Sequence, residues 1–487
     1  MNSKTNKYLL VIILGFGILY SIISIVNHFN FRTHALDLGA YTNALYDYAH
    51  FQWNDSTVFK EVKENLLSDH FDLYLILFSP LSLIFKNYTL LILQILSILF
   101  GGFGIYKYFT LDKTHANIAI YATLYFFLFF GVFSSVSFDY HSNVVATSLV
   151  PWFFVFLKQK KIIATSLMIL LIIIAKENIS LWIAFICICM IFEHRKEPFW
   201  RNYLIFSFIF CIVYFWIVTS VIMPRLSNNQ LYPHFHYSFL GNNSFDALMF
   251  LIQHPLESLK VLFINHTNHP FGDYVKIELH ILVLISGLPL LIRKPHYILM
   301  LIPIYFQKLY HDNYIMWGID GQYSIEYAPI LAIGIFSIIS KFRNKKVMKL
   351  TSIVILILTL SCTIRVMDNT VLYTNKSKIR FYKASHYSRD YSVIKVHKQL
   401  SEIPQNAIVS AQSPFLPHLS YRDNIYQFPL IKDAEFIIYS KKEDPYPLDE
   451  DDFFSLTSLF ENSNDWITIF KGEGLTILKK STYNKKK

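Results

Sequence analysis

Residues 71–85, FDLYLILFSPLSLIF, decide how the rest of this chain is arranged. The segment is strongly apolar, but it is shorter than the ~20 residues that a membrane-spanning helix prefers, contains Pro80 and is followed by Lys86. The whole chain of 487 residues is 53% hydrophobic and only 16% charged. Soluble domains carry roughly 25% charged residues, so this composition excludes a single water-soluble globule and predicts a polytopic membrane protein.

Eleven other apolar runs are candidates for membrane-spanning helices. The first follows Lys4 and Lys7 and has no small-residue cleavage site behind it, which predicts a retained helix rather than a removed signal peptide. The runs lie at about 8–26, 88–106, 117–136, 143–157, 162–175, 179–192, 202–222, 279–292, 296–309, 323–340 and 350–364.

The distribution of basic residues decides whether 71–85 crosses the membrane. If it does not cross and the amino terminus is cytoplasmic, the inner segments hold 17 Lys and Arg in 42 residues, whereas the outer loops hold 8. This is the positive-inside pattern, and a crossing at 71–85 would invert it. We therefore predict a re-entrant or outer-surface helix at 71–85, in a multi-pass protein of the bacterial cytoplasmic (inner) membrane whose amino terminus is cytoplasmic.

Two long loops of the transmembrane domain are then expected outside, 28–87 and 223–278. The first contains an apolar stripe at helical spacing, which predicts an amphipathic helix on the membrane surface. The stripe consists of Leu38, Tyr41, Leu45 and Tyr48. The loop 223–278 is rich in His, Asn, Pro and Tyr and is predicted to be irregular.

The carboxy-terminal portion alternates helix-like and strand-like pieces, and the turn at Gly472-Glu473-Gly474 predicts a hairpin. Its pieces are 390–400, AIVSAQ, 414–420, NIYQF, AEFIIYS, DDFFSLTSLF, DWITIF and LTILKK. The predicted fold is an α-helical polytopic membrane protein, with about eleven transmembrane helices and one re-entrant or outer-surface helix in 1–366 and a small extracytoplasmic α/β domain in 367–487.

Several classes of function are not supported by the sequence. The net charge of +10 sits largely in short loops between apolar runs, so it does not indicate nucleic acid. No Walker loop or GxGxxG fingerprint is present. The four cysteines lie inside apolar stretches, which makes a disulfide framework improbable.

Ionisable residues near the outer ends of the apolar runs are the candidates for chemistry, because such groups are costly near a membrane. Each has an ordinary alternative: a helix N-cap for Asp37, solvated loop ends for the others, or snorkelling of a helical hairpin tip for Lys176 and Glu177. The predicted topology nevertheless places all of them on the outer side. They are Asp37, Asp69, His70, Asp139, His141, Lys176 and Glu177.

Two kinds of chemistry suit this set. A carboxylate can deprotonate an acceptor hydroxyl while a lysine steadies a phosphate leaving group. Alternatively, two aspartates and two histidines can hold a divalent cation. The residues do not choose between these two readings, so the metal ligands stay unassigned.

Several stretches together resemble a prokaryotic family of polytopic predicted membrane proteins of unassigned function, over roughly 30–440. They are ALDLGAYTNALYDYAH, LLSDHFDLYLILFSPL, FDYHSNVVATSLVPW, IIAKENISLWIAF, QYSIEYAPILAIGI and AIVSAQSPFLPHLSYRDNIYQFPL. That family is distantly similar to the GT-C glycosyltransferases, which use polyprenyl-phosphate-linked sugars. The resemblance implies a base or metal ligand at Asp37 and a supporting acid at Asp139. The neighbours of Asp37 are Leu36 and Leu38, so the acidic pair of some relatives is missing and a metal requirement is not implied.

Three further residues are substrate-binding candidates. His418 and Arg422 are predicted on one face of a short helix that caps the outer opening, where Arg422 meets a phosphate or sugar. Tyr323, with Glu326 and Tyr327, is predicted to line the same cavity. A packing role for the first two and an interfacial tyrosine belt for the others are the ordinary alternatives.

The leading hypothesis is a GT-C-like glycosyltransferase that moves a sugar from a polyprenyl-phosphate donor to an envelope acceptor at the outer face. Asp37 would be the base, Asp139 its support and Lys176 the group near the leaving phosphate, while Asp69, His70, His141, Glu177, Tyr323, His418 and Arg422 would bind substrate. Membrane lipid and the lipid-linked sugar are the expected partners, and nucleic acid is not. A transporter or flippase that uses Lys176 and Glu177 as a coupling pair, and a non-catalytic envelope scaffold, remain alternatives.

Overall fold

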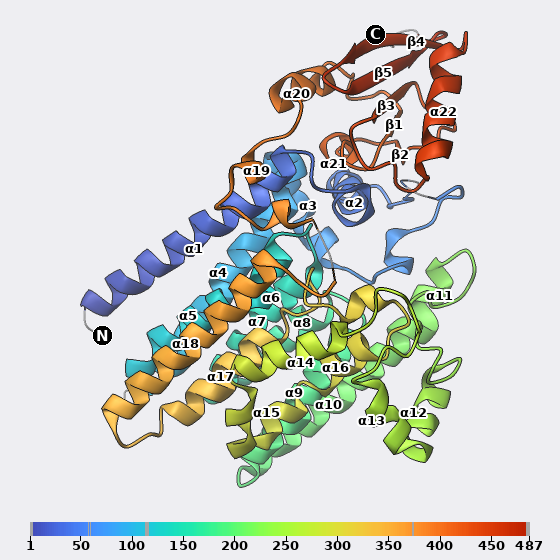
Figure 1. Ribbon diagram of the computed structural model, residues 1–487. Coiled ribbons are helices and arrows are strands. Elements are labelled where there is room, and N and C mark those ends of the chain that lie inside the picture. Colours follow the sequence, from blue (N-terminus) through green and yellow to red (C-terminus); the bar gives the residue numbers. More distant parts are fainter. Residues whose placement is uncertain (1–2, 57, 59, 113–115, 373–374, 484–487) are drawn as a thin grey trace.

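Two parts meet in the computed structural model, a large body of helices and a smaller mixed sheet with its own helices near the carboxy terminus (Figure 1). The structure describes residues 3–56, 58, 60–112, 116–372 and 375–483. The helices of the body are α1 (Ser3–Phe29), α2 (Ala40–Ala49), α3 (Tyr74–Phe85), α4 (Thr89–Thr110), α5 (Ala119–Leu128), α6 (Phe130–Val136), α7 (Ser142–Lys158), α8 (Ile162–Ile173), α9 (Ile179–His194), α10 (Pro198–Ile217), α11 (Met223–Leu226), α12 (Ser244–Gln253), α13 (Pro255–Val261), α14 (Val275–Ile285), α15 (Pro295–Leu299), α16 (Ile302–Leu309), α17 (Tyr327–Ile339) and α18 (Lys345–Asp368).

Within the described residues, four helical segments are long and apolar enough to cross a membrane. They are Lys7–Phe29, Tyr74–Thr110, Pro198–Leu226 and Lys345–Asp368. The pair α5 and α6, bent by 46° at Phe129, makes a fifth if it counts as one span. Shorter apolar helices such as α7, α8, α9 and α17 complete the body.

Besides the run 117–136, which is divided at Phe129, two more of the predicted runs are not single helices. The run 279–292 is divided at Gly287, which has a φ of 107°. Glycine adopts this conformation at little cost because it has no side chain. The run 296–309 is divided between α15 and α16, where residues 300–301 form a turn. The prediction of an irregular loop at 223–278 is also wrong in part, because α12 and α13 lie within it.

The segment 71–85 forms α3, which has 12 residues and is therefore about 18 Å long. The helix ends before Lys86, where φ turns to 46°, and a short 3-10 turn at Lys86–Tyr88 leads into α4. A helix of this length is shorter than the ~30 Å hydrocarbon core. It lies against α2 at the end of the body that carries the sheet, and α4 starts from that same end (Figure 1).

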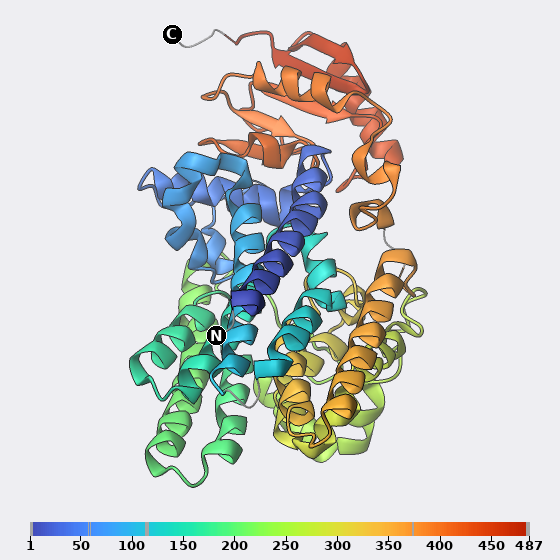
Figure 2. The same cartoon turned by 90° about the vertical axis from the view of Figure 1, so that its left-hand side faces the viewer.

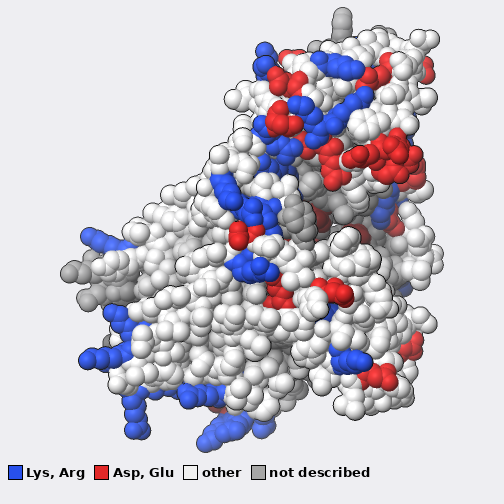
Figure 3. Space-filling model, viewed as in Figure 1, with Lys and Arg blue, Asp and Glu red and all other residues white. Residues whose placement is uncertain are grey.

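Charged side chains divide the molecule into three zones. In the space-filling view, Lys and Arg gather at the lower end, a broad band above it is almost uncharged, and charges of both signs cover the carboxy-terminal part (Figure 3). This is the arrangement that a membrane slab across the helices would produce. The inside-outside orientation itself stays a prediction.

The carboxy-terminal sheet has five strands in the order β2-β1-β3-β5-β4. Strand β1 is parallel to β2 and β3, whereas β5 is antiparallel to β3 and β4, so the sheet is mixed. The expected hairpin is confirmed, with its turn at Glu473 and Gly474. The elements are α19 (Ala384–Tyr387), α20 (Val393–Ser401), β1 (Val409–Ala411), α21 (Leu416–Leu419), β2 (Ile425–Gln427), β3 (Phe436–Ser440), α22 (Glu450–Asn462), β4 (Trp466–Gly472) and β5 (Leu475–Lys480).

This sheet sits on the end of the body where α1 finishes (Figure 2). It has a small core of its own, in which Phe453 of α22 packs on Phe428 and Tyr439. Contacts to the body include the Asn43 amide of α2, which donates to the Arg422 carbonyl at 2.7 Å. The division of the chain into domains at 366/367 stays a prediction.

Candidate functional site

Four loops that are far apart in sequence converge beneath the sheet, at one end of the helical body. They are 34–39, 66–73, 137–141 and 174–178, and each joins or precedes an apolar helix. Their side chains touch across the loops, as the distances below describe. The structure therefore brings together the seven ionisable residues that the sequence singled out at helix ends.

Asp37 occupies an unusual backbone conformation, with φ 69° and ψ −96°. Positive φ is uncommon for a residue with a side chain and is costly unless the surroundings impose it. The ordinary reading of Asp37 as an N-cap is wrong, because α2 begins after Gly39 and no side chain caps it. Instead, Oδ2 of Asp37 lies 3.7 Å from Nε2 of His141, and the carboxyl remains 24% exposed.

The electrostatic surroundings of Asp37 favour a proton near neutral pH. Burial and the carboxylates of Asp139 and Asp69 raise the pKa of Asp37 to about 7, against the opposing charge of Lys176. Burial also keeps the pKa of His141 well below its usual value, with help from Lys176 and His70. A neutral His141 leaves Asp37 as the group beside it that gains and loses a proton around pH 7.

Asp139 is buried and held by the first loop. Its Oδ2 accepts the backbone N–H of His34 at 2.8 Å, and its Oδ1 has no hydrogen-bond partner among the described residues. Burial raises the pKa of Asp139 to about 6, although Lys378 and the His34 N–H oppose the shift. Lys378 reaches the same place from beyond α18, with Nζ 2.9 Å from Nε2 of His34 and 5.4 Å from the Phe138 ring centroid.

Lys176 is a cation without a partner of its own. Across the described part of the chain, no hydrogen bond or ion pair engages its Nζ, although it lies within electrostatic reach of Asp37 and Asp69. The adjacent Glu177 turns away to His70, with Oε1 3.4 Å from Nδ1. The lysine is therefore available for an anion that the protein itself does not supply.

A second group of side chains surrounds His70. Its ring stacks on that of His234, with centroids 4.1 Å apart, and Nε2 of His234 lies 3.4 Å from Oδ1 of Asp69. Although burial opposes it, His70 and His234 hold the pKa of Asp69 below its usual value. His70 likewise lowers the pKa of Glu177 to about 2, so Glu177 stays ionised.

This second group has the ligand types of a divalent-metal site. One ligand atom from each of Asp69, His70 and His234 lies within 4.8 Å of the others. Two imidazoles and a carboxylate suit Zn²⁺ better than Mg²⁺. Glu177, which lies beside Nδ1 of His70, would orient that ring, as carboxylates do for zinc-bound histidines. The residues present therefore fit such an ion.

Tyr323 also reaches this end of the body. It lies in the turn 321–326 before α17, within electrostatic reach of Asp37, and its ring centroid is 5.8 Å from Nζ of Lys308. Nearby, Oε1 of Glu326 accepts the Asn143 amide at 2.7 Å. Tyr323 is therefore close enough to Asp37 to feel its charge, but it does not line the cavity bordered by His418 and Arg422, and its substrate-binding role stays a prediction.

His418 and Arg422 are placed elsewhere. The prediction that both lie on one helix face is wrong, because α21 ends at Leu419. The Arg422 guanidinium is buried and donates to three backbone carbonyls, those of Leu419, Ala407 and Pro404, at 2.6, 2.9 and 3.2 Å. His418 stacks on His28 of α1, with centroids 4.1 Å apart. Within the described part of the chain, neither side chain forms a hydrogen bond or ion pair with Asp37.

Three residues of the site were missed at the level of sequence. His234 belongs to the histidine-rich stretch LYPHFHY, whose composition could have indicated it. His34 sits three residues before Asp37 but acts partly through its backbone N–H, which no side-chain pattern reveals. Lys378 is one of several lysines in its segment and carries no distinguishing signal.

Comparison with known proteins adds a family and a fold. The sequence matches a family model described as "Predicted membrane protein (DUF2079)" over residues 27–470. No curated protein matches the chain. Among solved structures, the crystal structure of ArnT from Cupriavidus metallidurans bound to undecaprenyl phosphate is similar, with a TM-score of 0.57 over 98% of both chains at 10% identity. At this identity the likeness concerns the fold alone.

Proposed function

We propose that this chain, which belongs to the DUF2079 family of predicted membrane proteins, is a GT-C-like glycosyltransferase. It would transfer a sugar from a polyprenyl-phosphate donor to an envelope acceptor at the outer face of a bacterial cytoplasmic membrane. The proposal rests on the juxtaposition of Asp37, whose pKa is raised to about 7, with Lys176, which has no hydrogen bond or ion pair among the described residues.

Asp37 has the properties of a general base. A base works best when its pKa lies near the operating pH, and the pKa of Asp37 is raised to about 7. In the proposed step, Asp37 takes the proton of the acceptor hydroxyl as its oxygen attacks the anomeric carbon. Asp139 would support this role, because its negative charge strengthens Asp37 as a base.

Lys176 would stabilise the other end of the reaction. As the new glycosidic bond forms, the bond between the anomeric carbon and the phosphate oxygen breaks, and its electron pair leaves with the polyprenyl phosphate. A cation aimed at that developing charge lowers the barrier most when it has no competing partner in the protein. Such a donor is also in keeping with the fold, which is similar to that of a protein solved with undecaprenyl phosphate.

The transporter alternative depends on Lys176 and Glu177 acting as a pair. Glu177 instead faces His70, and its Oε2 accepts the Phe71 N–H at 3.2 Å. No corresponding observation favours a coupled pair, so the transferase is the better supported of the two. A scaffold role would leave the strained conformation of Asp37 without a purpose.

The proposal is tested with the purified full chain in lipid nanodiscs supplied with polyprenyl-phosphate sugar and an envelope extract as acceptor. Release of polyprenyl phosphate and incorporation of labelled sugar are both followed. Asp37→Asn removes the base at constant size and should slow transfer by about 10²–10⁴-fold. Asp55→Asn is the matched control, because Asp55 follows α2, is 48% exposed and, among the described residues, forms an ion pair with Lys63 alone. Transfer by Asp37→Asn at the wild-type rate would refute the proposal.

A further inference from the structure

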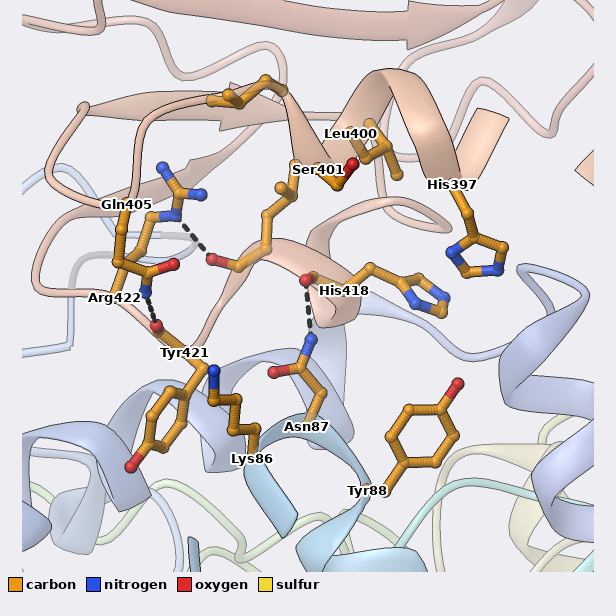
Figure 4. A pocket seen from close by; sticks show the side chains of 12 residues that line it. Lys86, Asn87, Tyr88, His397, Leu400, Ser401, Gln405, His418, Tyr421 and Arg422 are labelled. Atoms are coloured by element: carbon orange, nitrogen blue, oxygen red, sulfur yellow. Dashed lines mark hydrogen bonds between the residues drawn. The ribbon is translucent and has the colours of Figure 1, made fainter. Parts of the chain in front are cut away.

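A separate cavity lies at the seam between the carboxy-terminal sheet and the membrane helices. It has a volume of about 350 Å³, comparable with small-ligand pockets. Lys86 and Asn87 enter it from the turn between α3 and α4, whereas His397 and His418 enter it from α20 and α21 above (Figure 4). None of the residues that carry the proposed transfer lines it.

The lining of this seam cavity is cationic and contains no Asp or Glu. Lys86 is exposed, and no hydrogen bond or ion pair engages its Nζ within the described residues. Arg422 also borders the cavity, but its guanidinium is held by backbone carbonyls. Lys86 is therefore the positive charge that an incoming anion can use.

Polar groups with spare hydrogen-bonding capacity surround that charge. Nε2 of His418 is buried and has no partner among the described residues. The Asn87 amide nitrogen donates to the His418 carbonyl at 2.6 Å, which fixes the side chain across the seam. Buried polar groups are usually satisfied, so the open imidazole nitrogen indicates a ligand or water in the cavity.

The position of Lys86 relates the cavity to the lipid surface. The three residues before it, Leu83, Ile84 and Phe85, are 58%, 71% and 42% exposed. Such a surface is stable among acyl chains rather than in water, and a lysine at its edge reaches lipid headgroups. This pattern favours a position of the cavity at headgroup depth.

From these four observations we infer that the seam cavity binds the phosphate headgroup of an anionic membrane phospholipid. Lys86 pairs with the phosphate, and the imidazole of His418 exchanges a hydrogen bond with a headgroup oxygen. The site is distinct from the proposed donor site around Lys176 and does not depend on the transferase proposal. By joining α3 to the sheet, the bound lipid also holds the sheet on the membrane.

The test uses the full chain purified from nanodiscs that contain phosphatidylglycerol in phosphatidylcholine, with retained lipid counted by native mass spectrometry. Lys86→Gln should lower retention of phosphatidylglycerol about fivefold, since one lysine near an anionic surface is worth about that factor. Lys86→Arg should retain it. Lys398→Gln is the control, because Lys398 is exposed on α20 beside His397 but does not line the cavity.

Two further arms distinguish the source of the phosphate. Inorganic phosphate at millimolar concentration should not displace the lipid from the wild type. Displacement that depends on Lys86 would assign the cavity to a soluble anion and overturn the lipid assignment. Loss of undecaprenyl phosphate rather than phosphatidylglycerol in Lys86→Gln would make the cavity part of a donor site, and equal retention in all variants would refute the inference.

Discussion

Replacing Asp139 by asparagine should shift the pH dependence of transfer to lower pH. The amide keeps an oxygen that can accept the His34 N–H, at 2.8 Å from Oδ2 in the wild type, so the first loop keeps its anchor. It removes, however, the negative charge that helps to raise the pKa of Asp37 to about 7. A like charge commonly shifts a carboxyl by about one unit or more.

The size of the effect follows from the titration of the base. With a pKa of about 7, roughly one Asp37 in eleven is ionised at pH 6, whereas a pKa of about 6 gives roughly one in two. The rate at pH 6, relative to the plateau at high pH, should therefore rise about fivefold in Asp139→Asn. The absolute plateau can fall, because only the midpoint reports the pKa.

The measurement is kcat/KM for sugar transfer between pH 5 and 9, which reports the ionisation of the free enzyme. Asp55→Asn serves as the control and should keep the wild-type midpoint. A midpoint that stays in place or moves to higher pH in Asp139→Asn would refute the assignment of Asp37 as the titrating base.

Three other changes have expected outcomes. Lys176→Gln should lower the plateau rate of transfer about 100-fold. It should also move the pH midpoint higher, opposite to Asp139→Asn, because loss of a positive charge raises the pKa of Asp37. Unchanged kinetics would exclude a role of Lys176 in the transfer. Added Zn²⁺ should raise the unfolding temperature of the wild type but not of His234→Ala. At a free Zn²⁺ concentration of 100 times Kd, the stabilisation should be about 2.7 kcal/mol. An equal response of both proteins would place the metal elsewhere. Arg422→Met should destabilise the carboxy-terminal sheet by about 2–4 kcal/mol in limited proteolysis, because three carbonyls lose their donor, whereas unchanged protection would show that those hydrogen bonds contribute little.

The sequence predicted most elements of the fold because the patterns that define them are local. Strands such as AEFIIYS and the turn at Gly472-Glu473-Gly474 contain their own alternation and turn residues. Breaks inside apolar runs were missed, since Phe129 and the turn at 300–301 are as hydrophobic as their neighbours. Helix ends there are set by packing against other helices rather than by local composition.

The site could be predicted where ionisable residues lay near apolar runs, because charged groups are costly near a membrane. Asp139 and Lys176 stood out because they follow apolar runs directly, and Asp37 because it lies about ten residues beyond the first run, where the chain was expected to turn along the outer interface. Arg422 was predicted to meet a phosphate or sugar, but its guanidinium donates hydrogen bonds to backbone carbonyls of its own domain. The sequence alone does not distinguish these two kinds of arginine. The histidine-rich composition around His234 could have indicated a ligand, but only the fold shows that its loop brings it to Asp69 and His70.

Lys378 has a consequence for how the protein is made. Its contact with His34 joins residues 344 positions apart, and it reaches the acidic loops from a segment that follows the last long helix. During synthesis, the loops that hold both carboxyl groups emerge long before the lysine that braces them. A chain released before that segment would thus lack the lysine beside the proposed reaction centre, so that centre is complete only after residue 378 of 487, about three quarters of the chain, has been made.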